Sequence, residues 1–162
     1  SIGSYAALLA KFFGAEVTAI DSTNKLEKIK KIGADHLIDY TKENFTMSGK
    51  KYDVIFDVVY GSSFSACINA LQDDGCYLMA NTNPSRMLRA LWKSWTTKKK
   101  IIFALAGESV ADMKYIAELI ESNKIKPLID KRYPLEQTAA AHQYVEGGFK
   151  TGNVIITIGE QS

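Results

Sequence analysis

The sequence contains few of the residues from which disulfides and metal sites are built. Among its 162 residues are two cysteines and two histidines. Cys67 and Cys76 do not have the spacing of a zinc knuckle or a redox pair, so we expect two free thiols inside the protein. His36 and His142 are far apart in the sequence and have no matching cluster of Cys or Glu, so no metal site is predicted in this chain.

The sequence also lacks an excess of one charge and any long apolar run. Twenty Lys and Arg against eighteen Asp and Glu give a formal net charge of +2, which offers no electrostatic support for nucleic-acid binding. The lysine run 98–100 is short enough to be a solvated turn. No segment approaches the ~20 apolar residues that cross a bilayer, and no signal-peptide pattern is visible. We therefore expect a cytoplasmic protein with neither a nucleic-acid nor a membrane partner.

The sequence does contain a regular alternation of amphipathic and β-branched segments. Helices are predicted at 5–13, 24–32, 61–71, 84–95 and 109–122, and strands at 16–20, 36–38, 52–58, 75–80 and 100–105. This alternation predicts an α/β fold with a doubly wound parallel sheet, in which strand 52–58 is buried on both faces. The remainder is predicted as an extended piece at 124–132, a helix at 135–145 and a strand at 153–158.

The start of the chain has half of the pattern that is typical of dinucleotide binding. In a doubly wound sheet, ligands bind at the carboxyl ends of the strands, and phosphates bind at a helix N-terminus behind a glycine-rich turn. Gly3 lies at the start of the first predicted helix. Asp21 follows the next strand about eighteen residues later, where a ribose-binding carboxylate is expected. An ordinary helix-entry turn also explains Gly3, and a helix cap also explains Asp21.

A longer set of segments carries a resemblance to a known family. The segments are Ser1–Ala6, Ala10–Lys11, Gly14–Thr18, Lys31–Tyr40, Tyr52–Val59, Lys124–Asp130, Tyr133–Glu136 and Gly152–Ile156. In this order they resemble the medium-chain dehydrogenase/reductase superfamily, close to its zinc-independent quinone oxidoreductase branch. They cover nearly the whole chain, so the resemblance is specific even though each segment is ordinary by itself.

The resemblance implies a Rossmann-like fold that is truncated at its N-terminus. Gly3 matches the last glycine of the family's phosphate-binding turn, whereas the first strand and the earlier glycines are missing from this sequence. Residues 1–124 are expected to form the NAD(P)-binding domain, and residues 125–162 the strand-helix-strand segment that returns to the catalytic domain in the family. The implied activity is that of a quinone or enone reductase or an alcohol dehydrogenase. This chain is expected to be its cofactor-binding part, without a catalytic residue and inactive alone.

The resemblance also bears on the choice of cofactor. In NADP-dependent relatives a hydroxyl residue, a lysine and a tyrosine hold the 2′-phosphate, and these match Ser22, Lys25 and Tyr40. Asp21 departs from that pattern, because a carboxylate at a strand end accepts hydrogen bonds from the ribose hydroxyls and repels a 2′-phosphate. We favour NADP(H) and leave NAD(H) open. Without a ligand, Ser22 is explained as a cap, Lys25 as a solvated charge and Tyr40 as a core residue.

Two further loops match cofactor-lining segments of the family. The loop at 58–61, with Val59, follows the fourth strand of the family's fold, and the loop at 81–83, with Asn81, lies near the nicotinamide in the family. Both loops end predicted strands at the expected edge of the sheet. Ordinary strand-to-helix turns explain them as well.

The implied partners are a small-molecule quinone, enone, aldehyde or alcohol and a second copy of the chain. A homodimer is expected through strand 100–105, or through open edges of strand 153–158 and the extended piece near Leu128. Two alternatives remain open: a non-catalytic dinucleotide-binding or redox-sensing module, and an S-adenosylmethionine-binding domain, since an acidic residue after the second strand also suits that ligand. The match of the C-terminal segments disfavours the last.

Overall fold

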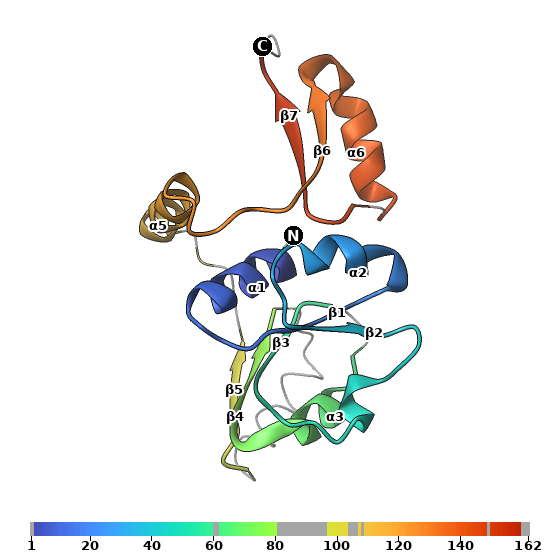
Figure 1. Cartoon of the computed structure of the whole chain (residues 1–162), viewed down its shortest axis with the longest axis vertical. Helices are drawn as coiled ribbons and strands as arrows, with labels where there is room; N and C mark the ends of the chain where they lie inside the picture. The colour runs from blue at the N-terminus through green and yellow to red at the C-terminus, as the bar shows by residue number, and fades with distance from the viewer. Residues whose placement is uncertain are drawn as a thin grey trace. The chain divides into compact units, whose positions relative to one another are not determined.

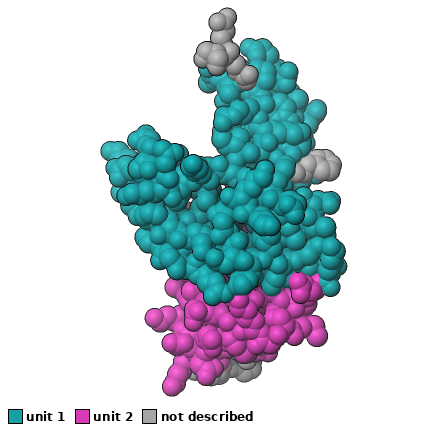
Figure 2. All heavy atoms as spheres, in the orientation of Figure 1, with its two compact units in different colours: residues 1–42, 110–162 teal, residues 43–109 magenta. Residues whose placement is uncertain are grey.

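The computed structural model describes residues 2–59, 62–80, 97–103, 107, 109–148 and 150–159. The chain divides into two compact units, residues 1–42 with 110–162 (the first unit) and residues 43–109 (the second unit), coloured teal and magenta in Figure 2. Each unit has its own sheet pairing and its own apolar core.

The N-terminal part of the first unit is a helix-strand-helix-strand sequence (Figure 1). Its elements are α1 (Ile2–Phe12), β1 (Thr18–Asp21), α2 (Thr23–Lys30) and β2 (His36–Asp39). Gly14 and Gly33 follow the two helices with φ of +82° and +86°, a conformation that glycine adopts without steric cost. β1 and β2 are parallel and in register from Thr18 with His36 to Asp21 with Asp39. Their carboxyl ends therefore lie side by side.

The C-terminal part of the first unit adds a helix and a second parallel strand pair. Its elements are α5 (Val110–Glu121), β6 (Ile129–Pro134), the short helix η2 (Leu135–Gln137), α6 (Thr138–Glu146) and β7 (Asn153–Thr157). β6 pairs with β7 in parallel. A buried cluster of Leu8, Ile32, Leu119 and Ile125 joins α1, the end of α2 and α5. Each such side chain contributes about 1.5–3 kcal/mol when it is fully buried.

The second unit is a three-stranded parallel sheet with the order β3-β4-β5. Its elements are η1 (Phe45–Met47), β3 (Tyr52–Asp57), α3 (Phe64–Asn69), β4 (Leu71–Met79) and β5 (Lys100–Phe103). Ser63 caps α3 by accepting a hydrogen bond from the backbone N–H of Ala66. The core consists of Phe64, Cys67, Ile68, Leu71, Tyr77 and Met79.

The predicted α/β class with parallel strands is confirmed, since all strand pairings in the described part of the chain are parallel. Several boundaries differ from the prediction: α1 begins at Ile2 instead of Tyr5, α3 has only six residues, and β4 begins at Leu71, four positions before the predicted start at Gly75. The predicted helix 84–95 and residues 104–105 lie outside the described residues. Cys67 and Cys76 form no disulfide, as predicted, but only Cys67 is buried, whereas Cys76 is half-buried.

The prediction that strand 52–58 is buried on both faces is wrong for the described structure. Val54 is 55% exposed, and Asp53 is also exposed. The apolar residues of this segment correctly indicate a strand, but composition does not show which elements cover its two faces. Ile55 and Asp57 provide the covered side of β3, with Ile55 packed against the core cluster.

Gly152, in the turn before β7, lies close to Leu128. Its φ is +104°, and an added Cβ would stand 2.9 Å from Leu128 Cγ and inside contact distance of the Leu128 carbonyl oxygen. Gly148 has a similar φ of +72° but open space around it. We expect Gly148→Ala to lower the free energy of unfolding by about 1–2 kcal/mol through backbone strain, and Gly152→Ala to lower it by more. Urea unfolding measures both variants. If Gly148→Ala and Gly152→Ala lowered the free energy of unfolding equally, the close approach of Leu128 to Gly152 would be contradicted.

Candidate functional site

The carboxyl ends of β1 and β2 bring together four of the residues that were predicted to bind a cofactor. Asp21 is the last residue of β1, Ser22 precedes the first residue of α2, and Lys25 is in the first turn of α2. Tyr40 follows β2, and its backbone N–H donates to the carbonyl oxygen of Asp21 at 3.2 Å. The turn after β2 is therefore attached directly to the end of β1.

The side chains of these residues differ in how they are held. The Asp21 carboxylate accepts a hydrogen bond from the Ser22 backbone N–H at 2.8 Å and lies 3.4 Å from the Ser22 hydroxyl. Ser22 is the N-cap residue of α2, in agreement with its explanation as a cap, although its side chain makes no capping hydrogen bond. Tyr40 is 62% exposed, so the explanation of Tyr40 as a core residue is wrong. Lys25 is half-buried.

Asp39, which sequence reasoning did not select, is the most heavily hydrogen-bonded side chain at this edge. It is 7% exposed and is the last residue of β2. It accepts from the Thr23 hydroxyl, from the Thr41 hydroxyl at 2.6 Å and from the Thr41 backbone N–H at 3.0 Å. The Lys42 ammonium lies 3.4 Å away. The hydrogen bonds from Thr23 and Thr41 hold the pKa of Asp39 well below its ordinary value.

A second buried carboxylate, Asp57, lies at the carboxyl end of β3 in the second unit. It is 6% exposed and accepts a hydrogen bond from the Tyr77 hydroxyl at 2.6 Å, and also one from the Ser62 hydroxyl. The backbone N–H of Val59 donates to the same carboxylate at 3.2 Å. Burial, followed by the bond to Asp57, raises the pKa of the Tyr77 hydroxyl well above its ordinary value. The residues after β3 are thus tied to the strand end.

The remaining predicted site residues are placed as follows. Gly3 is exposed in the first turn of α1. Val59 is 59% exposed and belongs to the second unit, whereas the group at Asp21 belongs to the first. Asn81 lies outside the described residues. The sequence does carry a signal for Asp39 and Asp57, since both are acidic residues at the end of a predicted strand.

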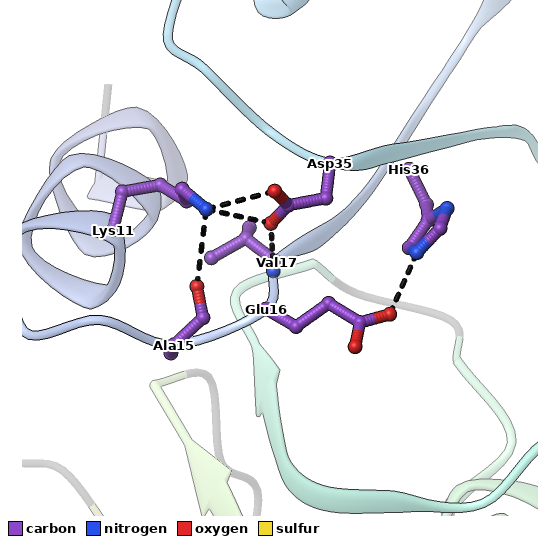
Figure 3. A network of polar contacts seen from close by, with 6 residues as sticks. All are labelled: Lys11, Ala15, Glu16, Val17, Asp35 and His36. Carbon is purple, nitrogen blue, oxygen red and sulfur yellow. Dashed lines mark hydrogen bonds and ion pairs between the residues drawn. The ribbon is translucent and has the colours of Figure 1, made fainter.

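At the opposite ends of the same strands, a polar network connects α1 with β1 and β2 (Figure 3). The Lys11 ammonium lies 2.8 Å from both carboxylate oxygens of Asp35, which also accepts the backbone N–H of Val17 at 2.7 Å. The hydrogen bond from Lys11 is the main cause of the lowered pKa of Asp35. His36 contacts Glu16 at 2.6 Å. The network fixes the end of α1 against the start of β2.

Neither a metal centre nor a membrane segment is evident in the part of the chain that the structure describes. No group of three or more His, Cys, Asp or Glu residues gathers there around a common point. Among the same residues, no helix has the length and apolar character to cross a bilayer.

The two parallel α/β units, with acidic side chains at the carboxyl ends of their strands, define a Rossmann-like nucleotide-binding fold. The model of the zinc-binding dehydrogenase family matches residues 32–156. The chain therefore belongs to the zinc-binding dehydrogenase family, within the medium-chain dehydrogenase/reductase superfamily and on its quinone oxidoreductase-like side.

Individual relatives agree with this assignment. The chain is 32% identical over 160 residues to a chloroplastic quinone-oxidoreductase homolog of Spinacia oleracea, covering 96% of this chain and 49% of that protein. It is 35% identical over 162 residues to 2-methylene-furan-3-one reductase of Solanum lycopersicum, covering 96% and 37%. The quinone oxidoreductase structure from Coxiella burnetii has a TM-score of 0.80 at 23% identity, covering 96% and 49%. The chain thus spans about half the length, or less, of these relatives.

The hydrogen bonds to Asp39 predict how stability depends on pH. Because the folded-state pKa of Asp39 is lowered from the ordinary value of 3.8, the carboxylate stabilises the fold above that value, and this contribution is lost as the pH falls through the folded-state pKa. We expect the melting temperature to begin to fall below about pH 5 and to continue falling as the pH approaches the folded-state pKa, and to fall less in Asp39→Asn. Asp73→Asn, at an exposed position of β4, is the control. An identical pH profile for Asp39→Asn and the wild type would contradict this role.

Removal of the Tyr77 hydroxyl tests whether its hydrogen bond to Asp57 stabilises the second unit. Tyr77→Phe keeps the ring in the core but leaves Asp57 without its buried donor, so the free energy of unfolding should fall by about 1–3 kcal/mol. Tyr115→Phe on α5, where the side chain is 44% exposed, should change it by less than about 0.5 kcal/mol. Chemical denaturation monitored by circular dichroism measures both, and equal effects would show that the bond to Asp57 does not stabilise the unit.

Proposed function

We propose that this chain is the cofactor-binding part of an NAD(P)H-dependent oxidoreductase that reduces a quinone or a conjugated enone. Aldehydes and alcohols form the wider substrate class. The proposal is supported by membership of the zinc-binding dehydrogenase family and by the activities named for relatives, which include an NADPH-dependent alkenal/one oxidoreductase of Arabidopsis thaliana, 33% identical over 161 residues. The cofactor, when bound, supplies the hydride, and the protein supplies binding and orientation.

The observation that carries the proposal is the group formed by Asp21, Ser22, Lys25 and Tyr40 around the N-terminus of α2. Helix N-termini favour anions through their free N–H groups and dipole. An ammonium and a hydroxyl in the same turn add the charge-assisted hydrogen bonds that a phosphate needs. The exposed Tyr40 ring offers a face and a hydroxyl beside them. The residues present therefore fit the adenosine end of a dinucleotide that carries a 2′-phosphate, and NADP(H) is the proposed cofactor.

The proposal also assigns roles to the other predicted site residues and to the C-terminal segment. Gly3 at the start of α1 would face the pyrophosphate, and the loops with Val59 and Asn81 would line the cofactor further along. Residues 1–124 would bind the cofactor, and residues 125–162 would pack against the substrate-binding part of the whole enzyme. A homodimer and a cytoplasmic location stay predictions. The spinach relative is named chloroplastic and a mouse relative mitochondrial.

A titration of the full chain with NADPH, NADH and S-adenosylmethionine at one fixed salt concentration tests the proposal, because phosphate contacts are screened by salt. We expect NADPH to bind tightest. Lys25→Ala should weaken NADPH roughly 10- to 100-fold, the value of a charge-assisted hydrogen bond, and should leave NADH nearly unchanged. Lys30→Ala, in the last turn of the same helix, is the matched control.

Three outcomes of this titration would count against the proposal. Tighter binding of NADH that weakens in Asp21→Ala would assign the site to NAD(H) instead. Binding of S-adenosylmethionine alone would replace the oxidoreductase with a different class of protein. An equal loss of NADPH affinity in Lys25→Ala and Lys30→Ala would show that the phosphate responds to the overall charge of α2, with no specific contact to Lys25.

A further inference from the structure

We propose that Asp39 is a positioning residue that sets the preference of this site for a 2′-phosphate, by fixing the turn with Tyr40 against the start of α2. The inference rests on the proposed function and deepens it. Asp39 is not a ligand of the cofactor in this proposal. It acts through Thr23, Thr41 and Lys42.

The contacts of Asp39 connect the start of α2 with the turn that follows β2. Thr23 is the first residue of α2, and Thr41 follows Tyr40 in the turn after β2. Both hydroxyls donate to the Asp39 carboxylate, and the two hydroxyl oxygens are 3.3 Å apart. One buried carboxylate therefore joins the start of the helix to the turn.

Asp39 and Asp21, the two carboxylates at this edge, differ in how many of their oxygens accept hydrogen bonds from the protein. Asp39 Oδ1 accepts both the hydroxyl and the backbone N–H of Thr41, while its Oδ2 accepts the Thr23 hydroxyl and lies near the Lys42 ammonium. With 7% of the residue exposed, no oxygen of Asp39 is left for a ribose hydroxyl. Asp21 uses only Oδ1 toward Ser22 among the described contacts, so Asp21 is the carboxylate that remains able to accept from a ligand.

The clamp formed by Thr23, Asp39 and Thr41 also determines which cation is available to a phosphate. Lys42 is paired with Asp39, whereas no ion pair of Lys25 is found among the described residues. Two hydrogen bonds hold the turn at Tyr40. The Tyr40 backbone N–H donates to the Asp21 carbonyl oxygen, and the backbone N–H of the next residue, Thr41, donates to the Asp39 carboxylate. Release of the clamp would let the turn with Tyr40 move away from the start of α2, the helix that carries Lys25. A ligand with a 2′-phosphate would then lose more affinity than one without.

Isosteric variants at Thr23 test the inference without disturbing the buried carboxylate itself. Thr23→Val removes the hydroxyl at an exposed position, and Thr23→Ser keeps it. Asp39→Asn removes the charge that receives the bonds. The first measurement is hydrogen exchange of the Thr41 amide in the ligand-free protein, since that N–H donates to Asp39. The second is the ratio of the dissociation constants for NADH and NADPH.

We expect Thr41 exchange to accelerate about fivefold or more in Thr23→Val and Asp39→Asn, the effect of one lost hydrogen bond of about 1 kcal/mol. The preference for NADPH over NADH should fall by a similar factor in the same two variants. Thr23→Ser should match the wild type in both measurements. A merely structural role would lower the melting temperature and weaken both dinucleotides equally, leaving their ratio unchanged.

The possible failures are distinguishable. Unchanged Thr41 exchange in Thr23→Val overturns the clamp, whether or not any cofactor binds. Faster exchange with an unchanged NADPH-to-NADH preference overturns the role in specificity while the proposed function stands. If the wild-type chain binds neither dinucleotide, the proposed function fails, and the inference fails with it.

Discussion

A carboxylate taken out of water must be hydrogen-bonded, because an unpaired buried charge costs more free energy than a small fold has available. This constraint organises the strand ends in both units. Asp39 at the end of β2 and Asp57 at the end of β3 are each less than a tenth exposed. Each accepts hydrogen bonds from residues that follow its own strand, and one more from another element, Thr23 of α2 for Asp39 and Tyr77 of β4 for Asp57. The need to satisfy the carboxylate therefore shapes the turn, and the turn is where a ligand of a parallel α/β sheet binds.

Asp130, in the C-terminal segment, is a third buried carboxylate that must be hydrogen-bonded. The Asp130 side chain on β6 is fully buried, and it receives the Lys28 ammonium of α2, the Tyr144 hydroxyl at 2.8 Å and the Thr151 backbone N–H at 2.9 Å. Burial would raise the pKa of Asp130, but these donors together lower it. Lys28 lies one turn from Lys25 on α2. The helix that begins at the proposed phosphate site is thus tied near its other end to the segment proposed to reach the substrate-binding part.

Periodicity and turn chemistry were sufficient to predict the class of most described helices and strands, whereas η1 was not predicted and β6 was predicted only as part of an extended piece. Gly14 and Gly33 mark the ends of α1 and α2 because their left-handed backbone is visible in the sequence as glycine. The boundary between α3 and β4 was not predictable, since Leu71 suits both a helix and a strand and only its pairing with Tyr52 of β3 assigns it to β4. The exposure of Val54 was missed for a related reason: composition indicates a strand, whereas coverage depends on tertiary contacts.

The candidate site was predictable only in part, for a similar physical reason. Asp21, Ser22, Lys25 and Tyr40 follow strand ends in the sequence, so their neighbourhood can be read from the alternation of elements. Asp39 and Asp57 also end strands, but their importance depends on donors such as Thr23 and Tyr77, which only the folded chain brings to them. A carboxylate in a sequence does not reveal whether its oxygens will be occupied by the protein.

The occupied carboxylates also decide what kind of selectivity is possible at the end of β1 and β2. Four charged side chains lie there: Asp21, Lys25, Asp39 and Lys42. Asp39 and Lys42 balance each other at 3.4 Å, and the remaining pair, Asp21 and Lys25, sums to zero formal charge. Net charge therefore cannot select a ligand with an additional phosphate. Selection has to come from position, because a charge-assisted hydrogen bond to an ammonium or hydroxyl depends on its geometry. In the proposed site, the cofactor preference would therefore depend on how the turn with Tyr40 is placed relative to Lys25 and the start of α2.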